Sequence, residues 1–247
     1  MKPKMGVFLG SNAQISVINS KKKSYNIKIN RLGVCLAFFC LLVFFSCKET
    51  NEKQSRVETL PFYGEATFTP RWIAPTNADK LKDFHRVSPF KLINQEGDTI
   101  SEKTFNDKIY ITDFFFTSCP GICPKMTANM GELQEEFLED DDVLLLSHSV
   151  TPVRDSVPIL KNYAESKGIK SEKWHIVTGE RSVIYSLGRK DYFVEEDLGL
   201  EKDPDDFLHT ENFVLIDKNR HIRGIYNGLN KASLQQLIAD VKTLQKE

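Results

Sequence analysis

The first 46 residues of this 247-residue chain contain no aspartate or glutamate. They carry seven lysine and arginine residues, and the last of these, Arg31, is followed by fifteen uncharged residues, LGVCLAFFCLLVFFS. A basic region, an apolar stretch and a small residue at its end are typical of an export signal. The stretch is shorter than the about 20 residues that a membrane-spanning helix needs. Residues 1–46 are therefore predicted to direct export.

The pair Ser46-Cys47 resembles the end of a bacterial lipobox, in which the cysteine receives lipid and becomes the new N-terminus. Cys47 is the predicted lipidation site, and 1–46 a lipoprotein-type signal peptide. An uncleaved signal anchor is the alternative. With either, we expect the folded part to be exported and held to a membrane on its extracytoplasmic, periplasmic side.

Cysteine is scarce. Of five cysteines, Cys35 and Cys40 lie in the signal and Cys47 would carry lipid, which leaves Cys119 and Cys123. A secreted disulfide scaffold has several pairs. Because this pair closes almost no loop, its value as a crosslink is small. The two cysteines are therefore expected to carry chemistry, with a purely structural disulfide as the alternative.

Positive charge is also in short supply once the signal is removed. The whole chain has 33 basic and 34 acidic residues, and loss of the seven basic residues leaves a net charge of about −8. Such a surface is a poor nucleic-acid binder and suits basic partners or cations. About 200 residues remain, enough for one domain with a sizeable core.

The hydrophobic patterns predict an α/β domain behind a polar tether at 47–60. Strands alternate with helices and are followed by a hairpin and a last helix, which is typical of a thioredoxin-like fold with a central mixed sheet flanked by helices. The domain spans 61–247, with short strands expected over 60–83 and a long loop at 195–209. Strands or hairpins are predicted at 90–100, 108–116, 142–150, 173–179 and 211–228, and helices at 124–139, 153–168, 182–193 and from 231.

Cys119 and Cys123 stand between a predicted buried strand and a predicted helix. There a thiolate faces unpaired backbone N–H groups and the positive end of the helix dipole, and both stabilise it. Thioredoxin-type redox centres place two residues between their cysteines, whereas this chain places three. Two thiolates on a first turn can form a disulfide or bind one soft ion. Cu(I) prefers thiolates, so one further ligand could complete a site.

Five histidines are candidates for that ligand. His209 ends the long loop, which in a thioredoxin-type sheet lies across from the cysteine-bearing turn, so it is the preferred candidate. His148, near the end of a buried strand, is second. His175 is expected in the core or at an edge, His221 in solvent, and His85 lies in an irregular segment.

Four segments resemble the SCO/SenC family of membrane-tethered, thioredoxin-like proteins over about residues 85–245. They are FFFTSCPGICPKM, SVTPVRDSVPILKNYAE, WHIVTG and FLHTENFVLIDKNRHIRGIYNG. The resemblance implies that Cys119, Cys123 and His209 bind copper, as Cu(I) or Cu(II). It also implies a metallochaperone that supplies copper to, or reduces the cysteines of, the dinuclear copper site of cytochrome c oxidase. The copper-bearing oxidase subunit is thus the expected partner, beside other periplasmic thiol-redox or copper proteins.

Two positions depart from the family pattern. Thr151 replaces an acidic residue, and His148 stands where an aliphatic residue is usual. Neither is one of the three implied ligands. His148 would add a polar group near the site or form a hydrogen bond in the core.

Other functions remain open from the residues alone. A thiol–disulfide oxidoreductase or redox sensor would use Cys119 to attack and Cys123 to resolve, without copper delivery. A peroxidase-like enzyme also fits the fold. Structural zinc needs four ligands, and the exported part offers two thiols and one convincing histidine.

Overall fold

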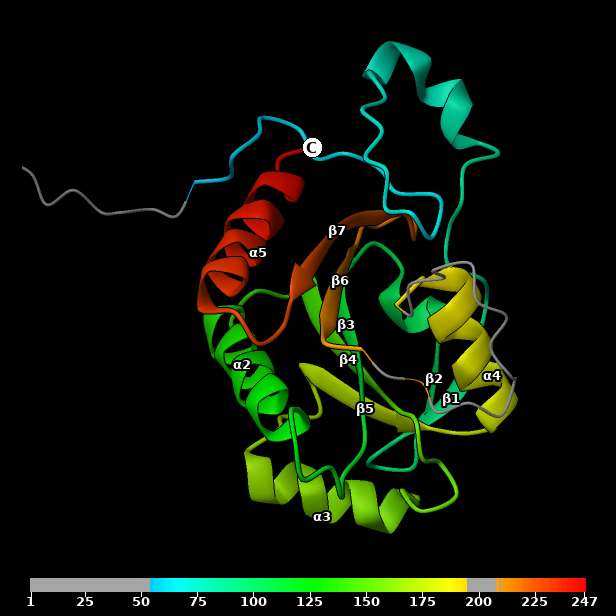
Figure 1. Ribbon diagram of the computed structural model, residues 1–247, viewed down its shortest axis with the longest axis vertical. Coiled ribbons are helices and arrows are strands. Elements are labelled where there is room, and N and C mark those ends of the chain that lie inside the picture. Colours follow the sequence, from blue (N-terminus) through cyan, green and yellow to red (C-terminus); the bar gives the residue numbers. More distant parts are fainter. Residues whose placement is uncertain (1–53, 195–207, 209) are drawn as a thin grey trace, which may run out of the picture. The chain divides into compact units, whose positions relative to one another are not determined.

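The computed structural model describes residues 54–194, 208 and 210–247. Within them, one seven-stranded mixed sheet has the order β2-β1-β5-β4-β3-β6-β7 (Figure 1). The central strands β3, β4 and β5 are parallel, and every other pairing is antiparallel. The strands are β1 (Lys91–Asn94), β2 (Thr99–Ser101), β3 (Ile109–Phe115), β4 (Val143–Ser149), β5 (Trp174–Thr178), β6 (Asn212–Ile216) and β7 (Ile222–Asn227).

Helices flank this sheet. The α-helices are α2 (Cys123–Glu136), α3 (Val157–Lys167), α4 (Arg181–Ser186) and α5 (Lys231–Leu244). The 3-10 helices are η1 (Pro75–Leu81) and η2 (Glu102–Phe105), and the π-helix η3 (Leu187–Asp191) continues α4. In Figure 1, α2 and α5 lie on the left of the sheet, α3 at the bottom and α4 on the right. The predicted α/β architecture with its hairpin β1–β2 is confirmed.

The sheet separates two cores. The first core joins β3, β4 and β5 to α2, α3 and α5, through residues such as Ile111, Phe115, Met126, Leu160 and Leu237. The second core joins the other face of the sheet to α4 and η3, through residues such as Tyr110, Phe114, Leu146, Ile184 and Tyr192. All seven residues of β3 are buried, as expected for a central strand with apolar side chains on both faces.

Helix α3 begins later than the predicted residue 153. Ser156 is its N-cap and Val157 its first residue. The preceding residues form a turn instead, because the backbone N–H groups of Arg154 and Asp155 both donate to the Thr151 carbonyl. The turn directs the Asp155 side chain into the interior, where it is 1 % exposed.

The expectation of short strands over 60–83 was wrong. The structure has only two isolated bridges there, Phe62–Arg71 and Tyr63–Ile222, and then the helix η1. Prolines at 61, 70 and 75 lack the N–H that a continuous ladder needs, which accounts for the interrupted pairing.

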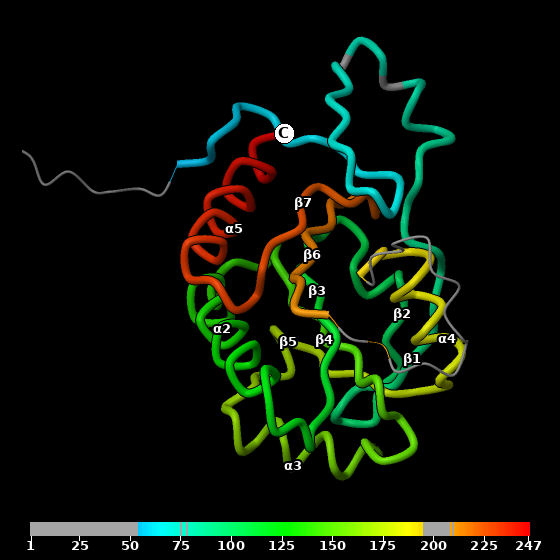
Figure 2. Tube along the Cα trace, in the orientation of Figure 1, coloured from blue at the N-terminus to red at the C-terminus, as the bar shows by residue number. Residues whose placement is uncertain are grey.

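The segment 54–60 runs past the C-terminal end of α5 (Figure 2). Ser55 Oγ donates to Asp240 Oδ1 at 2.5 Å, and the backbone N–H of Leu60 donates to Glu247 Oε1 at 2.7 Å. The buried Arg223 donates to the Leu60 carbonyl at 2.7 Å and also pairs with Glu247. The chain is therefore fixed to the domain from Ser55 onward, within the stretch predicted as a tether. Among the residues described, no helix has the length and apolarity to span a bilayer.

Two glycine substitutions test the helix boundaries with opposite expected signs. Gly168 follows α3 with φ of 68°, so Gly168→Ala should lower the free energy of unfolding by about 1–2 kcal/mol. Gly131 lies inside α2, where an added Cβ meets no atom within 4 Å, so Gly131→Ala should raise it by about 0.5–1 kcal/mol. Urea denaturation of both variants measures these changes. Equal effects would contradict the assigned helix end.

Candidate metal and redox site

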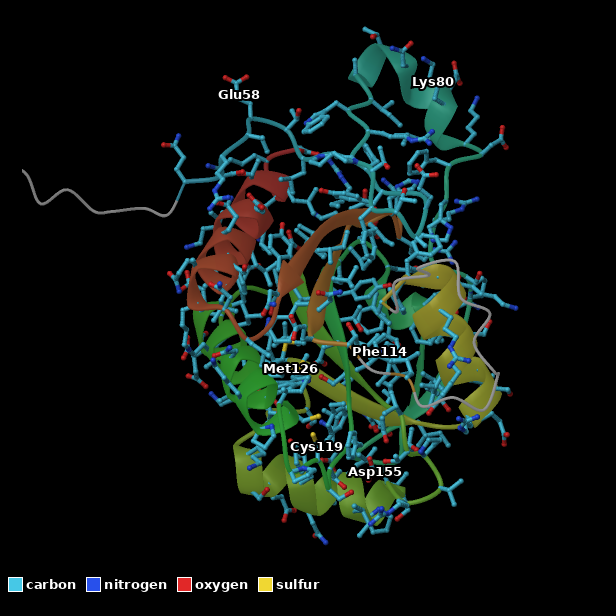
Figure 3. The ribbon with its side chains drawn as sticks, in the orientation of Figure 1. Glu58, Lys80, Phe114, Cys119, Met126 and Asp155 are labelled. Carbon is cyan, nitrogen blue, oxygen red and sulfur yellow. The ribbon has the colours of Figure 1, made fainter. Side chains whose placement is uncertain are left out.

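The two cysteines lie at the junction of β3 and α2. β3 ends at Phe115, a turn follows, and Cys123 is the first residue of α2, with Pro124 behind it. Proline suits this position because its missing N–H would have no partner in the first turn. Cys123 is buried in the first core, and Cys119 packs against that core while half-buried. Both are free thiols (Figure 3).

The two thiols differ in acidity. Burial raises the pKa of the Cys119 thiol, but hydrogen bonds from the Cys123 thiol and from the backbone of Cys123, Gly121 and Ile122 outweigh burial and lower it. Burial, together with the hydrogen bond to Cys119, raises the pKa of Cys123 to about 12. One proton therefore leaves from Cys119, and Cys123 stabilises the resulting thiolate.

Asp155 fixes the turn that carries Cys119. Its carboxylate accepts hydrogen bonds from the Thr117 N–H at 3.2 Å and the Thr117 hydroxyl at 2.6 Å, two residues before Cys119. It also accepts from the hydroxyls of Ser149 at 2.6 Å and Thr151 at 3.0 Å. Thr151, which replaces an acidic residue, thus acts as a donor to Asp155. Asp155 was not predicted as a site residue, although it lies within the quoted segment SVTPVRDSVPILKNYAE.

A second buried carboxyl, Asp113, lies on the sheet below the cysteine pair. It belongs to β3, and its charge acts on Cys123 and on Tyr163 of α3. Burial raises the pKa of Asp113 to about 7, against the hydrogen bond from Ser147, which lowers it. Among the described residues, its Oδ1 has no hydrogen-bond partner. Asp113 is therefore a protonatable group in the floor of the site, and it too was missed from sequence.

His148 does not join the cysteines. It is fully buried in contact with the second core, stacked on Phe114 with ring centroids 4.7 Å apart and bonded to the Thr112 hydroxyl at 3.1 Å. The cysteines contact the first core, on the other face of the sheet. Burial lowers the pKa of His148 to about 4, so it is neutral near pH 7. Of the two roles predicted for it, the hydrogen bond within the core is the one observed.

The other histidines are placed as follows. His221 was expected in solvent, and this was wrong: it is buried, makes edge contacts with the rings of Phe62 and Phe84, and pairs with Asp217 at 3.4 Å. His175 lies in β5, half-buried, and its ring contacts Phe105 of the second core. His85 bonds to the Asp191 carbonyl at 2.8 Å.

His209, the preferred third ligand, lies outside the described residues, as does Cys47. Leu208, the residue before His209, is buried in the second core. The described part of the chain holds no group of three or more His, Cys, Asp or Glu side chains that could bind a metal ion. Within that part of the chain, Cys119 and Cys123 are the two soft donors.

The thiol asymmetry predicts an ordered alkylation of the reduced protein. Cys119 should react first with iodoacetamide, at a pH below the usual thiol range, while Cys123 stays protected. Cys123→Ala removes the hydrogen bond to Cys119 and should shift its pH–rate profile upward. Mass spectrometry of the modified peptides gives both rates. Faster modification of Cys123 in the unsubstituted protein would contradict the asymmetry.

Asp113 predicts a pH-dependent stability of the reduced, metal-free protein. Because its pKa rises on folding, from about 4 to about 7, the folded state retains a proton that the unfolded state loses, and stability falls as pH rises through this window. Asp113→Asn should gain stability relative to the unsubstituted protein by about 1.4 kcal/mol per pH unit over this range. Urea denaturation at several pH values measures the difference. His148, whose pKa is lowered by burial, contributes a stability that rises with pH. This contribution is the same in both proteins and drops out of the difference between them. A pH-independent difference would show that Asp113 is not protonated by folding.

Comparison with known proteins identifies relatives over the same region. The family model described as SCO1/SenC matches residues 78–246. A SCO1/SenC family lipoprotein from Bacillus anthracis is 29% identical with a TM-score of 0.57, covering 65% of this chain and 95% of its own. BsSco, whose structure identified a disulfide switch and which is a member of the Sco family of cytochrome c oxidase assembly proteins, is 31% identical with a TM-score of 0.56, covering 66% and 94%.

A third relative was solved with copper bound. ScoI of Bradyrhizobium japonicum is 25% identical with a TM-score of 0.51, covering 64% of this chain and 99% of its own. These neighbours confirm the thioredoxin-like fold of Sco proteins for this chain. The family model covers well over half of the chain, and the chain therefore belongs to the SCO1/SenC family.

Proposed function

We propose that this protein binds one copper ion outside the cytoplasm. It would supply that copper to, or reduce the cysteines of, the dinuclear copper site during cytochrome c oxidase assembly. The observation that carries the proposal is the pair of free thiols at the start of α2, one acidified and one buried. Family membership supports it, because relatives include a copper-bound ScoI and a cytochrome c oxidase assembly protein.

The donor set fits copper as cargo. Thiolates are soft ligands that suit Cu(I), and Cu(I) accepts few of them. Cys119 loses its proton readily, and binding of the metal would displace the proton of Cys123. His209 is the proposed third ligand, as the likeness to the SCO1/SenC family implies. Transfer to a partner would occur by exchange of these ligands, with no change in the oxidation state of the metal.

A second candidate function, thiol–disulfide exchange, is favoured by the difference between the two thiols. The Cys119 thiolate would attack a partner disulfide, form a mixed disulfide and release one partner thiolate. Cys123, after losing its proton, would attack Cys119 and release the second partner thiolate. The partner gains two electrons and the pair becomes a disulfide. Since the disulfide has no thiolate left, this step would also release bound copper.

The N-terminal region supports a place of action at a membrane outside the cytoplasm. A lipid on Cys47, with residues 1–46 removed, would hold the domain to a membrane on the periplasmic side. The relative from Bacillus anthracis is itself described as a lipoprotein, which supports this proposal. The expected partners are the copper-bearing oxidase subunit and other periplasmic thiol-redox or copper proteins.

A copper titration tests the proposed ligand set. Under anaerobic conditions, the reduced protein should hold one Cu(I) against a competing chelator. His209→Ala should weaken it by on the order of 100-fold, since loss of even an indirect supporting group costs 10–100-fold. His175→Ala is the matched control, because this histidine contacts the second core, away from the cysteines.

Three outcomes separate the functions. Loss of affinity in His209→Ala alone supports copper delivery. If the unsubstituted protein binds Cu(I) weakly, or if His209→Ala binds Cu(I) as tightly as it does, the three-ligand site is contradicted. If that variant still reduces a disulfide partner at the original rate, thiol–disulfide exchange becomes the preferred function.

A further inference from the structure

A groove of about 940 Å³ lies at the end of the domain where the described chain begins. The segment 54–60, the loop at Trp72 and the C-terminal end of α5 form its walls. Its lining includes the apolar side chains of Val57, Phe62, Trp72 and Leu81. The groove plays no part in the cysteine chemistry.

Trp72 is the most informative residue of this groove. Its side chain is 59 % exposed, although tryptophan buries more apolar surface than any other side chain when it enters a core. The indole Nε1 donates to the Thr59 carbonyl at 3.2 Å, so the polar edge of the ring is held by the chain and its apolar face stays uncovered. Val57, beside it in the groove, is also exposed. Tryptophan with one polar and one apolar side is favoured at the interface between a bilayer and water.

The path of the chain brings this groove close to the proposed anchor. Ser55 and Leu60 are fixed to α5 and to Glu247, and Gln54, where the described chain begins, lines the groove. Between Cys47 and Gln54 a fully extended chain spans at most about 25 Å. If Cys47 carries lipid, as proposed above, the groove cannot be far from the membrane surface.

The charges around the groove suit phospholipid headgroups. Arg56 and Lys246 line it, and Lys80 is exposed on η1 at the same end of the domain (Figure 3). Of the two acidic residues in the lining, Glu247 is paired with Arg223, and Glu58 is exposed. Basic side chains near a bilayer are attracted to anionic lipids.

We propose that this groove is a docking surface for an anionic phospholipid bilayer, with Trp72 and Val57 among the headgroups and Arg56 and Lys246 next to the phosphates. The proposal rests on the lipid anchor of the proposed function. In Figure 3, Glu58 and Lys80 lie at one end of the domain and Cys119 at the other. Docking would therefore hold the cysteine pair away from the membrane, directed toward the part of a partner that stands above the bilayer.

The chain contains two tryptophans, which makes a selective test available. The full chain, lipidated in a bacterial host, is reconstituted into vesicles of phosphatidylcholine and phosphatidylglycerol with brominated acyl chains, which quench nearby tryptophans. The difference between the unsubstituted protein and Trp72→Phe reports on Trp72. The matched internal control is Trp174, which is 2 % exposed in the first core and should stay unquenched. We expect Trp72 to lose most of its emission, and to do so only in vesicles.

The opposing outcomes can be told apart. A protein that floats with the vesicles while Trp72 stays unquenched overturns the docking surface but leaves the anchor. A protein that does not float overturns both, whereas the copper titration is unaffected by either result. Protection of Trp72 from aqueous iodide without quenching by brominated lipid would show that a protein, a second copy or a partner, covers the groove, and this also overturns the proposal.

Discussion

The buried carboxylate of Asp155 is the interaction on which the site depends. It accepts four hydrogen bonds from three segments: the turn before Cys119, the end of β4 and the turn before α3. A buried charge is tolerated only when such donors replace water. Because those donors come from separate parts of the chain, the same bonds that satisfy Asp155 also fix the Cys119 turn against the sheet. The backbone groups that lower the pKa of Cys119 lie just after it, at Gly121, Ile122 and Cys123.

The sheet divides the polar groups of the interior into two sets. On the face of α2 and α3, Asp113 lies near the cysteines, and burial raises the pKa of its carboxyl to about 7. On the other face, His148 is neutral and packed among aromatic rings. Copper binding and thiol exchange both require loss of the Cys123 proton. The two proposed functions therefore use one set of groups, and both require the reduced pair, because the disulfide has no thiolate left to bind copper or to attack a partner.

The arrangement of the domain also bears on how the site meets a partner. Arg223 and Glu247 hold the N-terminal segment against α5, at the end of the domain remote from Cys119 (Figure 3). The proposed lipid anchor would therefore join the domain at the end remote from the cysteines.

The sequence alone determined the strand–helix alternation, the position of both cysteines at a strand end and helix start, and the resemblance to the SCO/SenC family, because these are local patterns. It did not determine which side chains meet. Side chains alternate along β4, so His148 points to one face of the sheet and Ser147 and Ser149 point to the other. Only the assembled sheet decides which of these faces carries the cysteines. His221 is buried because Phe62 and Phe84 come from far upstream to cover it. Asp155, likewise, is an ordinary turn residue until tertiary structure surrounds it with donors, since contacts between distant segments have no periodic signal in the chain.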